Sequence, residues 1–197
     1  MVRSILLMLA LAAPPVAAIV GAEVRERQRY PRRFAEVVPN EVYRGGFPSV
    51  DDIVHLKEDK SIRTIVNLTG PTDRPEEREM LAKVESLGIH LLRFPMPGDG
   101  RGDFAMLEQA AVAIADQGNR PIFFHCAAGK QRSNAAWAAY RMKFCGWSVE
   151  EALAELERDY DLDRNAERAL CDHLRDYQRW RFEYRPQPTT AATREGR

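Results

Sequence analysis

One segment of the chain combines residue types whose spacing suits chemistry on an anion. Cys126 precedes Arg132 and Ser133 across a short stretch that contains Gly129. The stretch lies between an apolar run and an alanine-rich segment typical of a helix, so it predicts a loop at a helix N-terminus. Such a loop directs backbone N–H groups toward a bound anion, and phosphate fits there.

The residues of this loop have distinct expected roles. Cys126 is the expected nucleophile, because only a thiolate attacks and the loop amides, helix dipole and Arg132 stabilise one. The planar Arg132 guanidinium is expected to clamp two phosphate oxygens. Ser133 is expected to donate a hydrogen bond to the Cys126 sulfur and ease departure of the thiolate. The expected phosphate-binding residues are Ala127, Ala128, Gly129, Lys130, Gln131 and Arg132.

Two side chains within the loop have less certain duties. Lys130 adds positive charge at the rim of the expected site. Gln131 either positions the hydrolytic water or narrows the pocket. His125 directly precedes the nucleophile and is expected to orient the loop rather than to act as an acid.

Alternating apolar runs and helical patterns surround this loop and predict an α/β domain with a helical C-terminal half. The first expected strand ends near Arg44, and two more cover residues 62–68 and 89–94. A further strand at residues 121–124 runs directly into His125 and Cys126. Helices are expected from Ser49 to Lys57, Pro75 to Gly88, Phe104 to Gln117, Arg132 to Cys145, from Ser148, and from Ala166 to Tyr184.

Composition excludes several classes of protein. Lysine plus arginine and aspartate plus glutamate both total 29 in 197 residues, so the chain lacks the basic excess of a nucleic-acid-binding surface. Three cysteines are too few for a disulfide framework. The four histidines are scattered and form no zinc-site spacing with cysteines, so no metal is expected.

The segment from Cys126 to Ser133 resembles the Cys-x5-Arg-Ser/Thr signature loop of the protein tyrosine and dual-specificity phosphatase superfamily. Val42 to Ser49, Val-Tyr-Arg-Gly-Gly-Phe-Pro-Ser, resembles an element near the start of its small bacterial and fungal/plant-type dual-specificity-like branch, and Ile65 to Leu68 resembles the next strand. The resemblance covers roughly residues 40–180. It implies a largely parallel sheet of four or five strands flanked by helices, with no metal or organic cofactor.

The resemblance also implies a general acid, usually an aspartate on a loop before the nucleophile. Asp99 and Asp103 are the candidates. Asp103 directly precedes the helix expected from Phe104, so it has a competing duty as a helix cap. Asp99 has no such duty and is flanked by glycines that suit a mobile loop, so Asp99 is favoured.

The resemblance leaves the substrate open between phosphotyrosine or phosphoserine proteins, phosphoinositides and inositol phosphates. It implies a metal-independent phosphatase that works through a phosphocysteine intermediate. The alternative is a catalytically weak pseudophosphatase that binds phosphorylated ligands. A sulfurtransferase with a persulfide on Cys126 is a weaker third hypothesis, because it gives Arg132 and Ser133 no purpose.

Beyond the expected catalytic domain at residues 40–185, the termini suggest targeting and disorder. Residues 1–22 resemble a signal peptide, which predicts export to the periplasm or medium. The apolar stretch 4–22 is also almost long enough for a membrane anchor. The arginines that follow it favour an uncleaved anchor that keeps the catalytic domain in the cytoplasm. Residues 23–39 are expected to form a basic linker, and residues 186–197 a disordered tail.

Overall fold

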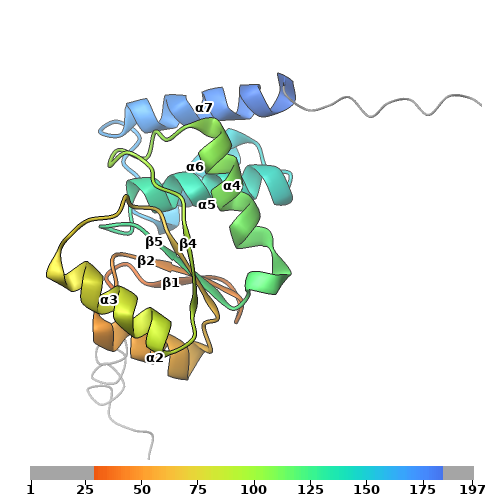
Figure 1. Cartoon of the computed structure of the whole chain (residues 1–197). Helices are drawn as coiled ribbons and strands as arrows, with labels where there is room; N and C mark the ends of the chain where they lie inside the picture. Colours follow the sequence, from red (N-terminus) through yellow and green to blue (C-terminus); the bar gives the residue numbers. More distant parts are fainter. Residues whose placement is uncertain (1–28, 184–197) are drawn as a thin grey trace, which may run out of the picture.

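A five-stranded sheet forms the centre of the computed structural model, which describes residues 29–183 (Figure 1). In spatial order the strands are β1 (Ala35–Val38), β2 (Val42–Gly45), β5 (Ile122–His125), β3 (Thr64–Asn67) and β4 (His90–Arg93). Only β1 is antiparallel to its neighbour. The expected mostly parallel sheet of four or five strands is therefore confirmed.

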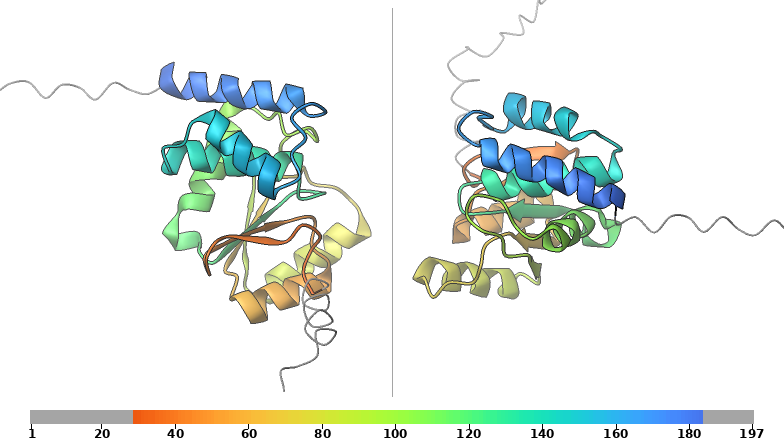
Figure 2. Two further views of the ribbon diagram at one scale, coloured as in Figure 1. Left: turned by 180° about the vertical axis from the view of Figure 1, so that it is seen from behind. Right: turned by 90° about the horizontal axis from the view of Figure 1, so that it is seen from above.

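Helices cover both faces of this sheet (Figures 1 and 2). One face carries α2 (Val50–Lys60) and α3 (Pro75–Ser86). The other carries α4 (Phe104–Ala115), α5 (Gln131–Phe144), α6 (Val149–Asp159) and α7 (Arg168–Glu183), with a short 3-10 turn at Gln117–Asn119 after α4. The helical C-terminal half is thus stacked on one side of the sheet.

Local sequence signals explain where several helices begin. Ser49 and Asp52 form a capping box at the start of α2, and Ser148 and Glu151 form another at the start of α6. Pro75 occupies the first turn of α3, where its missing N–H costs nothing. These predicted helix starts are confirmed.

A hydrophobic core lies on each side of the sheet, as expected for strands buried on both faces. Tyr43, Ile65 and Phe123 face the smaller core beneath α2 and α3. Val66 and Phe124 face the larger core, in which Trp137 of α5 stacks on Tyr140. At the end of α5, Phe144 and Cys145 are exposed.

Residues 30–38 belong to the folded unit rather than to the basic linker expected over 23–39. Ala35–Val38 pairs with β2 as the edge strand β1. Phe34 stacks between Tyr30 and Tyr43 and so joins the smaller core. This edge strand escapes sequence patterning because its residues are only partly buried and it is four residues long.

The expectations for the two termini lie outside the described residues. They concern the signal peptide or anchor at 1–22 and the tail at 186–197. Within residues 29–183, no helix is both long and apolar enough to cross a membrane.

Candidate active site

The loop from Cys126 to Lys130 leaves the centre of the sheet. It follows β5, which is paired on both sides, and it leads directly into α5. Gly129 has a positive φ of 71°, and a Cβ there would lie 2.7 Å from the backbone of Gly45 and Gly46. The loop can therefore pack against the end of β2 only because this residue is glycine.

The Cys126 thiol is buried and yet more acidic than an ordinary cysteine. Its side chain is 2% exposed, and burial alone would raise its pKa. The nearby Ser133 hydroxyl, together with the backbone N–H groups of Ser133, Lys130 and Ala128, outweighs burial and lowers the pKa. The loop therefore favours a thiolate at this position, as a nucleophile requires.

Arg132 lies at a cleft of about 800 Å³ that opens beside the loop. Its buried Nε atom has no hydrogen-bond partner among residues 29–183. The cleft is lined by Arg32, Phe47, Thr69, Gly70, Pro71, Thr72, Arg74, Glu76, Glu77, Ala127 and Arg132. Its volume is that of a pocket for a whole small molecule, which is more space than one phosphate needs.

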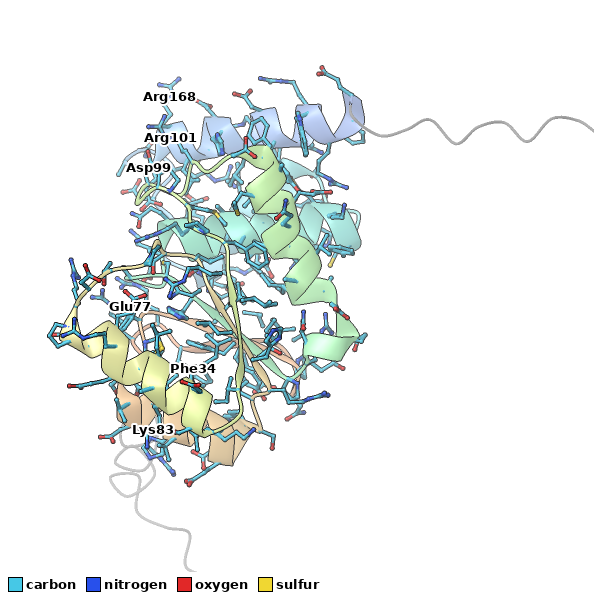
Figure 3. All side chains as sticks on the ribbon, in the orientation of Figure 1. Phe34, Glu77, Lys83, Asp99, Arg101 and Arg168 are labelled. Carbon is cyan, nitrogen blue, oxygen red and sulfur yellow. The ribbon has the colours of Figure 1, made fainter. Side chains whose placement is uncertain are left out.

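The two candidate acids have different structural duties. Asp103 accepts hydrogen bonds from the backbone N–H groups of Ala105 and Met106, so it caps α4 as expected. Asp99 is exposed and forms an ion pair with Arg101, with 2.7 Å between Oδ2 and Nε (Figure 3). The N–H of Arg101 and its guanidinium lower the pKa of Asp99.

The loop that carries Asp99 approaches the phosphate loop through its backbone. A Cβ on Gly100 would lie 2.7 Å from the carbonyl oxygen of Gln131 and 3.3 Å from the backbone nitrogen of Arg132. Asp99 is thus one residue from a direct packing contact with the start of α5.

The side chains of Lys130 and Gln131 are directed to Glu167, which precedes α7. Lys130 Nζ lies 2.9 Å from Glu167 Oε1, and Gln131 Nε2 donates to the same oxygen at 3.2 Å. The positive charge that Lys130 adds at the rim is therefore paired with a carboxylate.

The sequence profile described as the tyrosine phosphatase family matches residues 30–172. The chain belongs to this family. The match includes the Cys126 to Ser133 segment described above.

Curated members of the tyrosine phosphatase family are distant in sequence. TpbA of Pseudomonas aeruginosa strain UCBPP-PA14, a dual specificity protein phosphatase, is 26% identical over 117 residues. That match covers 59% of this chain and 50% of TpbA. The chain spans about half the length of the curated relatives it matches.

Solved structures agree with the fold of the family. The core catalytic domain of the PP-IP phosphatase Siw14 from S. cerevisiae, in complex with citrate, has a TM-score of 0.59 and 23% identity and covers 78% of this chain and 93% of that chain. P. aeruginosa TpbA has a TM-score of 0.58 and 22% identity, with 76% and 94% covered.

Arg44 supports the family's signature loop from behind, a role that sequence reasoning missed. It is 1% exposed, and its Nη2 donates to the Gly129 carbonyl at 3.1 Å and to Asn134 Oδ1 at 2.5 Å. The guanidinium lies over the Tyr160 ring at 4.2 Å. Burial lowers its pKa to about 10, so Arg44 stays charged at neutral pH. The Tyr-Arg-Gly element was the available signal.

Arg32 and Arg33 hold the other side of the same loop. Arg32 Nη2 donates to the Ala127 carbonyl at 2.9 Å, and Arg33 Nη1 donates to the Ala128 carbonyl at 3.1 Å. Arg33 also pairs with Asp161 at 2.8 Å. We expected these two arginines in a linker. Instead they hydrogen-bond the carbonyl groups of the loop, whose N–H groups are left to face Cys126.

An ion pair fixes Glu77, a buried residue of the cleft lining. Glu77 lies 2.9 Å from Arg93, and its carboxylate accepts from the hydroxyl and the N–H of Thr72. Arg93 also donates to the Thr69 carbonyl at 3.2 Å. Both ends of the stretch from Thr69 to Thr72 are thereby fixed.

His125 is completely buried beneath the loop. Its ring packs edge-on against Phe47 and stacks on Phe123. Burial lowers its pKa to about 4, so the ring is neutral near pH 7. This position agrees with the expected orienting role.

Proposed function

We propose that the chain is a phosphatase that hydrolyses phosphate monoesters through a phosphocysteine intermediate on Cys126. The observation that carries this proposal is the buried thiol whose pKa is lowered by loop N–H groups and Ser133. The unpartnered Nε of Arg132 beside it supplies a second support.

The proposed first step transfers the phosphoryl group to sulfur. The Cys126 thiolate forms an S–P bond as the bond between phosphorus and the leaving oxygen breaks. Arg132 and the loop amides hold the remaining phosphate oxygens, where negative charge is spread in the transition state. Asp99, when protonated, gives its proton to the leaving oxygen.

The proposed second step regenerates the thiol site. Asp99, now a carboxylate, takes a proton from water as the water oxygen forms a bond to phosphorus. The S–P bond breaks, and the hydrogen bond from Ser133 stabilises the departing thiolate. Inorganic phosphate leaves. The proposed cycle uses side chains and backbone amides of the protein, and water.

One observation favours a second candidate function, a binding module with weak turnover. The ion pair with Arg101 lowers the pKa of Asp99, so its carboxyl is largely deprotonated at neutral pH in this state. A site without a protonated acid binds phosphate esters but turns over those with poor leaving groups slowly.

Turnover of p-nitrophenyl phosphate in the presence of a chelator distinguishes the two candidates. We expect chelator-resistant release of phosphate, a burst of one equivalent of nitrophenol, and loss of both in Cys126→Ser. Tight vanadate binding without turnover would favour the binding module. Undiminished turnover in Cys126→Ser would contradict a cysteine nucleophile.

The identity of the acid is tested with two leaving groups. We expect Asp99→Asn to reduce kcat for an alkyl phosphate by about 10²–10⁴-fold and for p-nitrophenyl phosphate much less, because nitrophenolate needs no proton. Asp103→Ser is the matched control, since serine preserves the cap of α4. A larger loss in Asp103→Ser would transfer the acid role to Asp103.

For substrates, we propose phosphotyrosine or phosphoserine proteins or inositol phosphates. The names of the relatives support both kinds, since TpbA is called a dual specificity protein phosphatase and Siw14 a PP-IP phosphatase. TpbA has also been solved with phosphotyrosine. The kcat/KM values for a panel of phosphopeptides and inositol phosphates rank these substrates directly.

We also propose that residues 4–22 either export the chain or anchor it to a membrane. The basis is the apolar stretch in the sequence alone. Fractionation of cells that express the full chain tests this proposal. Recovery of the full-length chain in the cytosolic fraction would contradict both export and membrane anchoring.

A further inference from the structure

We propose that Arg32 and Arg74 form a second anion subsite in the cleft, so that the preferred substrate is a small molecule carrying two phosphate groups. This inference rests on the proposed phosphatase function and names its substrate class. The observation behind it is that two of the three arginines that line the cleft come from outside the signature loop.

The loop itself offers little free positive charge beyond Arg132. Lys130, its other cation, is paired with Glu167. By contrast, Arg32 and Arg74 both line the cleft and are exposed. Among residues 29–183, the Arg32 side chain donates only to the Ala127 carbonyl, and the Arg74 guanidinium has no hydrogen-bond or ion-pair partner.

The acidic residues of the cleft do not neutralise these arginines. Glu77 is committed to Arg93 and Thr72. Glu76 is the remaining acid of the lining, so it opposes one of the positive charges. Arg32, Arg74 and Arg132 together therefore exceed the free negative charge of the lining.

The size of the cleft fits this assignment. A volume of about 800 Å³ accommodates a whole small molecule. When Arg132 holds the phosphate that is transferred, the fork of Arg74 stays available for a second one, and a guanidinium binds phosphate in bidentate fashion. A phosphotyrosine side chain carries only the phosphate that is transferred, so its ring would give Arg32 and Arg74 no anion to bind.

Binding to Cys126→Ser protein tests this subsite independently of turnover. Calorimetry gives the Kd of a hexose 6-phosphate and of the corresponding hexose 1,6-bisphosphate. We expect the bisphosphate to bind about tenfold more tightly, as one charge-assisted contact supplies. When Arg74→Ala is combined with Cys126→Ser, the ratio of the two Kd values should fall close to one.

Two further variants control for general charge effects. Lys83→Ala removes a positive charge from the last turn of α3, the helix that begins directly after Arg74 (Figure 3). This variant should leave the ratio unchanged. Glu76→Gln removes the opposing charge and should raise the ratio. Arg32→Ala is less informative, because it also releases the Ala127 carbonyl.

A ratio near one in the parent protein, or equal weakening of both ligands by Arg74→Ala, would overturn the subsite. If an acidic phosphotyrosyl peptide depends on Arg74 more than the bisphosphate does, the assignment to a small molecule is wrong. Because these are binding measurements, absence of turnover leaves the subsite standing and refutes only the phosphatase cycle.

Discussion

Cys126 shows how a buried side chain is kept reactive. Removal of a thiolate from water is unfavourable, so the position of Cys126 by itself favours the neutral thiol. The donors around the sulfur reverse that preference, and the Ser133 hydroxyl is the largest of their contributions. The acidity of this thiol therefore depends on the neighbouring donors and not on the cysteine alone.

Removal of the Ser133 hydroxyl should make Cys126 a weaker acid. We expect Ser133→Ala to shift the pH profile of iodoacetamide alkylation of Cys126 upward by about one unit, the size of one hydrogen bond to a charged group. Ser133→Thr keeps the hydroxyl and should retain the parent profile. An unchanged profile in Ser133→Ala would assign the lowered pKa to the backbone amides alone.

With Asp99 as the proposed acid, Arg101 should control the pH range over which the enzyme is active. A general acid works only while protonated, so the rate falls as pH rises through its pKa. Arg101 lowers that pKa, so Arg101→Ala should move the alkaline limb of the kcat profile for an alkyl phosphate to higher pH.

Arg168, at the start of α7, provides the control for this experiment (Figure 3). Arg168→Ala removes an arginine that makes no hydrogen bond to Asp99 and should leave the alkaline limb in place. If Arg168→Ala moves the limb as far as Arg101→Ala, general electrostatics rather than the ion pair sets the pKa.

At the scale of elements, local sequence signals predict the helices and the parallel strands but not the edge of the sheet. Helix starts such as Ser49 and Ser148 are encoded within three residues, so they are readable from sequence. Strand β1 is only partly buried, and its extended conformation is stabilised mainly by pairing with β2. The residues of β1 themselves therefore carry little signal for a strand.

Gly100 should be the sensitive position of the loop that carries Asp99. Its φ is 80°, and a Cβ would contact the Gln131 carbonyl at 2.7 Å. We expect Gly100→Ala to cost about 1–2 kcal/mol of stability, measured by urea unfolding, and to lower kcat as Asp99 is displaced. In Gly98→Ala, where the added Cβ meets nothing within 4 Å, both quantities should stay near the parent values.

The same distinction between local and distant information applies to the candidate site. Cys126, Arg132 and Ser133 are predictable because their roles follow from one short segment. Arg32 and Arg33 contact the loop across a separation of 95 residues, and Glu167 reaches Gln131 across 36. No pattern in the sequence pairs an arginine with one particular distant carbonyl, so those contacts appear only in three dimensions.

At the scale of the whole molecule, Arg44 connects parts that are remote in the chain. From β2 it contacts the signature loop at Gly129, α5 at Asn134 and the residue after α6, Tyr160. Two further guanidinium nitrogens have no partner among the described residues. One buried cation thus joins the sheet, the site and the helical layer.

Replacement of Arg44 by lysine should separate charge from geometry. Both hydrogen bonds of Arg44 come from one nitrogen, Nη2, so lysine loses mainly the planar guanidinium that lies over the Tyr160 ring, and we expect a loss of about 1–2 kcal/mol in urea unfolding. Displacement of the loop should also lower kcat/KM by roughly 10–100-fold. Arg63→Lys, at an exposed arginine, is the control, and reduced stability with unchanged kcat/KM would make Arg44 purely structural.

The central position of β5 has a consequence for the timescales of the site. Its amides form ladders with β2 and β3, so their exchange with deuterium requires both neighbours to separate, which costs a large part of the global unfolding energy. Asp99 lies in an exposed loop outside any ladder. We therefore expect the backbone that leads into Cys126 to exchange slowly and the backbone at Asp99 to exchange fast, so the two candidate catalytic residues are carried by segments of unequal local stability.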